Sequence, residues 1–106
     1  MMANLHRGEI DAELGGEKLT LCLTLGALAE LEATYGEEDL LSLAERFEGG
    51  RISAVDAIRV IAAGLRGAGH DVSDAEVGAL SVPGGAAGYV GIVSRLLKAT
   101  FAPPAS

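Results

Sequence analysis

The hydrophobic period of the sequence changes from two to about 3.6 near Thr24, and this change constrains the fold more than any other feature. Before it, apolar and polar residues alternate on both sides of the pair Gly15 and Gly16. Alternation is typical of strands with one buried face, and glycine accepts the positive φ of a tight turn, so residues 8–23 are predicted to form a β-hairpin. After Thr24 the apolar residues recur every three or four positions, which favours amphipathic helices.

Four or five short helices are expected to follow the hairpin, because capping residues and glycines divide the rest of the chain. Thr24 and Ser53 are candidate N-caps, Ser73–Glu76 has the spacing of a capping box, and Gly36 is placed to end the first helix. The predicted fold class is α+β, mainly α, with an N-terminal β-hairpin followed by these helices in a single small domain. The expected helices cover residues 25–35, 38–48, 53–66, 74–80 and 86–101.

A chain of 106 residues is long enough for one hydrophobic core. We expect one domain over residues 7–101, a flexible arm at 1–6 and a frayed tail at 102–106. No apolar run approaches the roughly 20 residues of a membrane span, and the N-terminus lacks the pattern of a signal peptide. The single cysteine, Cys22, has no partner for an internal disulfide. These features predict a cytoplasmic protein with no membrane partner.

Acidic residues dominate the charge, with 15 Asp and Glu against 8 Lys and Arg and a net charge of −7. Most of the excess lies before residue 49, and its main interpretation is a solvated face that keeps the protein soluble. A dedicated electrostatic docking surface is the alternative. An acidic chain repels the phosphate backbone, so no nucleic-acid partner is expected. Helices at 53–66 and 74–80 resemble a helix-turn-helix, but the second lacks Arg, Lys, Asn or Gln to contact bases.

No arrangement of catalytic or metal-binding residues stands out. Zinc needs roughly three or four ligands, and His6, His70 and Cys22 are far apart in the sequence. A dyad of Cys22 with a histidine is a weaker alternative than a structural cysteine, since nothing nearby in sequence would lower its pKa. The glycine-rich segments Gly64–Gly69 and Pro83–Gly91 lack the Lys and Ser/Thr of a phosphate loop, so they are interpreted as helix ends and close packing. We therefore expect no enzyme, no metal and no cofactor.

The aliphatic face of the hairpin and the residues that follow it are the candidate binding surface. A two-stranded ribbon is marginally stable in water, so this face must pack on helices or on another chain. The sequence leaves both alternatives open. The candidate partner-binding residues are Leu19, Leu21, Leu23, Leu25 and Leu28.

Segments Leu23–Glu32, Asp56–Gly69 and Val72–Leu80, in this order, resemble small proteins of the gene transfer agent family. Such proteins are encoded among the tail genes of phage-like particles in alphaproteobacteria. The resemblance implies a tail assembly chaperone that binds the tape measure protein or the tail-tube protein. The alternative that it implies is a structural component associated with the tail tube, and hence with the particle. The resemblance carries no catalytic residues across.

Overall fold

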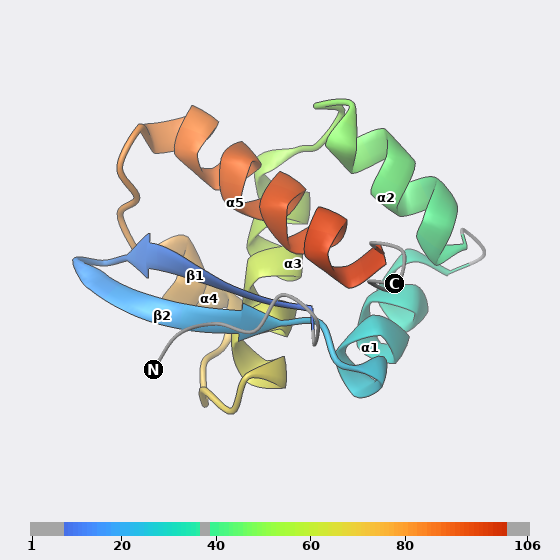
Figure 1. Ribbon diagram of the computed structural model, residues 1–106, viewed down its shortest axis with the longest axis horizontal. Coiled ribbons are helices and arrows are strands. Elements are labelled where there is room, and N and C mark those ends of the chain that lie inside the picture. The colour runs from blue at the N-terminus through green and yellow to red at the C-terminus, as the bar shows by residue number, and fades with distance from the viewer. Residues whose placement is uncertain (1–7, 37–38, 102–106) are drawn as a thin grey trace, which may run out of the picture.

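A computed structural model describes residues 8–36 and 39–101 of the chain. The arm expected at 1–6 and the tail expected at 102–106 lie outside the described residues. Within the described ranges the chain forms an N-terminal hairpin followed by helices, as predicted (Figure 1). The elements are β1 (Glu9–Leu14), β2 (Glu17–Cys22), α1 (Leu25–Tyr35), α2 (Leu40–Glu48), α3 (Ala54–Gly67), α4 (Asp74–Gly78) and α5 (Gly85–Phe101).

The hairpin has the register that its alternating sequence predicts. β1 and β2 pair antiparallel with Ile10 opposite Leu21 and Asp11 opposite Thr20, and both turn glycines have positive φ. The Thr20 hydroxyl donates to the Asp11 carboxylate across the strands at 3.0 Å. This register places the aliphatic side chains on one face, and Glu9, Asp11 and Glu13 on the other. Ile10 and Leu21 are both buried, so the aliphatic face is part of the core.

The helices begin at the residues that can cap them. Thr24, Asp39, Ser53 and Ser73 are N-caps whose side-chain oxygens accept hydrogen bonds from backbone N–H groups in the first turn. Because Asp39 is the cap of α2, that helix begins at residue 40, and the expected start at residue 38 lies outside the described residues. Ser53 forms a capping box in addition to the one predicted at Ser73.

Helix α4 ends two residues earlier than expected. The backbone N–H of Leu80 donates to the carbonyl of Val77 in a final turn. The chain then turns away, and the Ser81 carbonyl accepts a hydrogen bond from the backbone N–H of Gly15 at 2.8 Å. The loop between α4 and α5 is therefore fixed to the turn of the hairpin.

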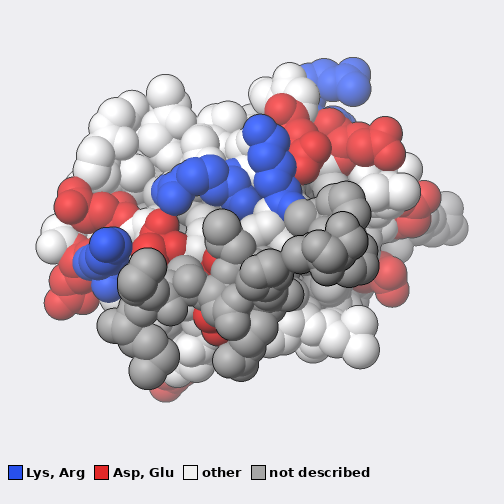
Figure 2. Space-filling view, viewed as in Figure 1, with Lys and Arg blue, Asp and Glu red and all other residues white. Residues whose placement is uncertain are grey.

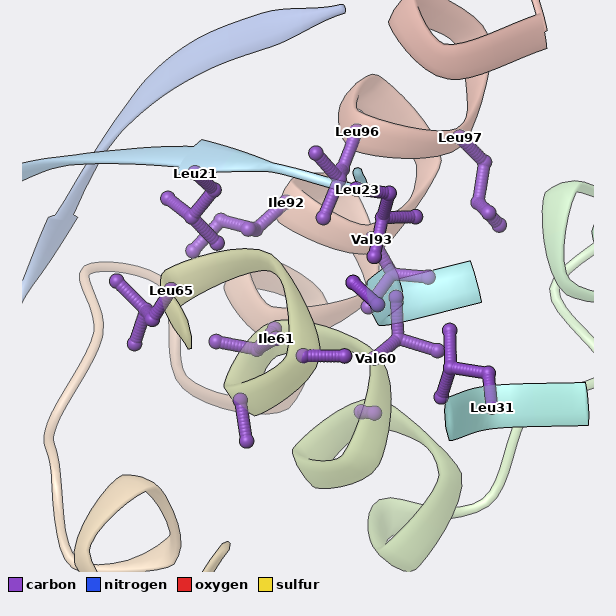
Figure 3. Packing of buried hydrophobic residues seen from close by; sticks show 14 of the residues in the cluster. Leu21, Leu23, Leu31, Val60, Ile61, Leu65, Ile92, Val93, Leu96 and Leu97 are labelled. Atoms are coloured by element: carbon purple, nitrogen blue, oxygen red, sulfur yellow. The ribbon is translucent and has the colours of Figure 1, made fainter. Parts of the chain in front are cut away.

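Helix α3 lies at the centre of the fold and packs against β2, α1, α4 and α5 (Figures 1 and 3). Every residue from Val60 to Leu65 is buried, because neighbours cover this part of the helix on all sides. The first turn of α3 has no such cover. Val55 lies in this first turn and is 53% exposed.

Two glycines of α3 allow the close approach of β2. A Cβ at Gly67 would overlap the carbonyl oxygen of Cys22. A Cβ at Gly64 would lie 2.7 Å from Cδ2 of Leu96 on α5 and 3.3 Å from Cβ of Leu21 on β2. A side chain at Gly67 would force β2 away from the helix, and a side chain at Gly64 would displace the end of the Leu96 side chain and crowd Leu21. This part of the glycine-rich segment is therefore used for close packing of α3.

Gly67→Ala is expected to lower the free energy of unfolding by about 3 kcal/mol, because the added methyl group must displace β2. Gly91→Ala is the matched control, since nothing lies within 4 Å of the Cβ position at this helical glycine of α5. The control is expected to raise the free energy of unfolding by about 0.5–1 kcal/mol through helix propensity. Urea denaturation followed by circular dichroism measures both variants. Equal stability of the two variants would contradict the close approach of α3 and β2.

Candidate interaction surfaces

The five leucines proposed from the sequence do not form one surface. Leu21 and Leu23 are buried, and Figure 3 shows them among side chains of α3 and α5. Leu19 is partly buried and packs against the same core. Leu28 is also partly buried, whereas Leu25 is 84% exposed. Of the five candidates, Leu25 is therefore the residue most available to a partner.

Helix α1 is covered on one side only. Ala27 and Leu31 are its buried residues, and the helix packs on α3. Leu25, Ala29 and Ala33 do not share this side, because they are exposed and recur at intervals of four residues. A helix that is apolar on more than one side is normally buried on more than one side.

Leu25, Ala29, Glu32 and Ala33 form the α1 outer face, and all four residues are exposed. Their spacing places them along one side of the helix. The helical spacing of Leu28, Leu31 and Tyr35 indicates one shared side of α1 but does not reveal this second face.

Helix α5 carries an exposed basic stripe. Its exposed residues Ala87, Gly91, Arg95 and Lys98 recur at helical spacing, and we refer to them as the α5 outer stripe. The helix contains no Asp or Glu. Arg95 Nη1 donates to the carbonyl of Asp11 at 3.0 Å and so joins α5 to β1. In Figure 2, basic side chains lie near the middle of the view, and others lie among the acidic side chains toward its left and upper right.

Arg66 holds α1, α3 and α4 together. Its guanidinium forms an ion pair with Glu30 of α1 and donates to the Val72 carbonyl at 3.0 Å and to Asp74 at 3.2 Å. Burial acts to lower the pKa of Arg66, but the hydrogen bonds to Glu30 and Asp74 outweigh it and the pKa rises. The contacts of this cation are therefore internal and fix the position of α1.

A second polar cluster joins the end of α1 to the start of α3. The Tyr35 hydroxyl donates a hydrogen bond to the Asp56 carboxylate. The rings of Tyr35 and Phe47 pack in a T-shaped arrangement with their centroids 6.0 Å apart. The Arg59 guanidinium carbon lies 5.7 Å from the centroid of the Tyr35 ring. Burial and then the hydrogen bond to Asp56 raise the pKa of Tyr35 to about 12. Burial acts to raise the pKa of Asp56, but hydrogen bonds from Tyr35 and Ser53 lower it. The cluster therefore holds the end of α1 against the start of α3.

An apolar cavity of about 270 Å³ opens between the starts of α3 and α5 and the end of α4. Its two polar side chains already have partners. The Ser53 hydroxyl accepts a hydrogen bond from the Asp56 backbone N–H, and the Tyr89 hydroxyl donates to the Leu80 carbonyl. Small-molecule sites normally add converging polar groups that orient the ligand, and neither side chain serves that purpose here.

Among residues 8–36 and 39–101, no group of three or more His, Cys, Asp and Glu side chains could hold a metal ion. In the same part of the chain, none of the helices has the length and apolar character needed to cross a membrane.

Tyr35→Phe is expected to cost about 1 kcal/mol near neutral pH, because it removes the hydrogen bond to Asp56. The folded-state pKa of Tyr35 is raised, so the stability that the protonated hydroxyl contributes is present below about pH 10 and is lost as the pH approaches 12. The wild type should therefore lose more stability than Tyr35→Phe between about pH 9 and about pH 11.5. Parallel urea titrations measure this difference. A constant offset between the two proteins would contradict the partly buried hydrogen bond between Tyr35 and Asp56.

Comparison with known proteins identifies a family. Residues 7–103 match the model of a family described as phage tail tube protein, GTA-gp10. No curated protein and no solved structure matched the chain. The matched range includes the hairpin and every helix described above, and it confirms the resemblance to proteins of gene transfer agents and phage tails. The chain belongs to the phage tail tube protein family GTA-gp10.

Proposed function

We propose that the protein is a structural component associated with the tail tube of a gene transfer agent or siphophage-like particle. The observation that carries the proposal is the family match, which spans residues 7–103. A tail component acts through contacts with other proteins, of which the tail-tube protein and the tape measure protein are the proposed partners. Such a role requires binding and no catalysis, so the proposal retains the expectation that the protein is not an enzyme.

The surface of the chain supports a role in protein–protein contacts. The α1 outer face offers an exposed leucine beside small residues, and the α5 outer stripe offers positive charge. Both helices pack on α3, so these surfaces are held on a buried and closely packed centre. A surface that is already ordered loses little conformational entropy when it binds.

A tail assembly chaperone acting in the cytoplasm is the second candidate function. One observation favours it: the aliphatic face of the hairpin is buried in the core of its own chain. Within the described residues the sheet has two strands, which offers little sheet for the wall of a tube. A chaperone would instead cover an apolar helix of the tape measure protein, using the α1 outer face.

Mass spectrometry of purified particles distinguishes the two functions. A structural component is expected in intact particles at a fixed ratio to the other tail proteins, because it stays in the assembled tail. The tape measure protein serves as a positive marker for tails, and an abundant cytoplasmic protein serves as a marker for contamination. Abundance in the producing cells together with absence from the particles would contradict the structural role and favour the chaperone.

A further inference from the structure

We propose that the apolar cavity between the starts of α3 and α5 and the end of α4, here called the α3–α5 cavity, receives one uncharged apolar side chain of another tail protein. The inference rests on the proposed function as a structural tail component, and it names the chemistry of a contact that such a component makes. It is carried by the size of the cavity, by its uncharged lining and by the hydrogen bonds that fix its walls.

The size of the α3–α5 cavity limits what can enter it. Its volume is about 270 Å³. An apolar cavity of about 150 Å³ is large enough for benzene, so an aromatic or branched aliphatic side chain fits. Small-molecule and cofactor sites normally have volumes of about 300–1,000 Å³, so this cavity is smaller than most of them. A side chain presented by a larger molecule is therefore the occupant of matching size.

The lining of the cavity favours an apolar occupant. Ala57, Ile58 and Val90 contribute hydrocarbon surface to it. The hydroxyl groups of Ser53 and Tyr89 are already engaged in hydrogen bonds within the chain. A polar group that entered would lose its water and gain little in return, which costs free energy. An apolar group would leave water without this penalty, which favours its binding.

The charge distribution excludes ionised occupants. Each residue that lines the cavity is uncharged. Residues 77–94, which include the end of α4, the loop after it and the first part of α5, contain no Asp, Glu, Lys, Arg or His. A phosphate, carboxylate or ammonium group in the cavity would therefore lack a counter-charge in the lining. In a chain with a net charge of −7, this uncharged surface suits a partner segment that is itself apolar.

Hydrogen bonds hold the walls of the cavity in place before an occupant enters. Capping boxes at Ser53 and Ser73 fix the starts of α3 and α4. The Tyr89 hydroxyl donates to the Leu80 carbonyl and so joins α5 to the segment after α4. A cavity that is already formed loses little conformational entropy on binding. Apolar anchors that fill such pockets contribute much of the affinity of protein–protein interfaces.

The first test is a titration of the full chain with toluene, which stands in for an aromatic side chain, followed by amide NMR. Toluene is expected to bind with a Kd of about 1 mM and to shift the amide signals of Ile58 and Val90. Benzoate and benzylammonium have a similar shape and carry opposite charges. Both should leave these signals unchanged, because the lining has no counter-charge for either.

Two phenylalanine variants of α5 show whether the probe occupies the cavity. Ala86→Phe should weaken toluene binding at least about tenfold, because its ring takes the space that the probe needs. Ala87→Phe is the matched control, since Ala87 is exposed on the same helix and does not line the cavity. The control should bind toluene as the wild type does. Both variants should fold, because both alanines are exposed, and circular dichroism melting checks this.

The second test is mass spectrometry of particles from cells that produce either variant. Ala86→Phe is expected to lower the amount of the chain in particles at least about fivefold relative to Ala87→Phe, because the partner's side chain can no longer enter. Native mass spectrometry of the purified wild-type chain and its sedimentation velocity test for other occupants, namely a small molecule and a second copy of the chain.

Three results would overturn the inference: no binding of toluene, binding that Ala86→Phe leaves unchanged, and equal incorporation of the two variants into particles. A wild-type chain that carries a bound apolar small molecule, or one whose self-association Ala86→Phe removes, would also overturn it by giving the cavity a different occupant. Absence of the wild-type chain from particles would overturn the proposed function and the tail partner together, whereas equal incorporation of the variants would overturn the inference alone.

Discussion

The close contact between α3 and β2 is the constraint on which the rest of the structure depends. Gly64 and Gly67 remove the side chains that would otherwise hold the strand away from the helix. The aliphatic face of the hairpin thereby gains the cover that an isolated two-stranded ribbon lacks in water. Helices α1, α4 and α5 pack against the sides of α3 that β2 does not cover. The burial of Val60–Leu65 on every side is the consequence of this arrangement.

Burial of the hairpin determines where the chain can contact other proteins. Leu21 and Leu23 belong to the core, so they are not available to a partner. The exposed apolar surface near them is the α1 outer face. Polar contacts fix this helix along its length: Thr24 caps its start, Glu30 pairs with Arg66, and the Tyr35 hydroxyl binds Asp56 at its end. A helix held at three points presents its outer face in a defined orientation.

Much of the fold was predictable, because local chemistry decides it. Alternation around Gly15 and Gly16 fixes the hairpin register, and Ser53 and Ser73 mark helix starts through their caps. What covers each face was not predictable, since periodicity shows that residues share a side but not what lies opposite. Leu21 and Leu25 were both candidate binding residues, yet Leu21 is buried against α3 and Leu25 is 84% exposed. The sequence around a glycine such as Gly67 looks the same whether the glycine ends a helix or leaves room for the backbone of a neighbouring strand.

Amide hydrogen exchange in β2 tests most directly the claim that the hairpin is part of the core. The account predicts that the hydrogen-bonded amides of β2 exchange as slowly as those of Ile61 and Leu65 in α3, because all of them open only when the whole domain unfolds. Exchange of the β2 amides many times faster than exchange in a protected α3 would contradict the account. It would mean that the strand separates from the helix while the helical core stays folded.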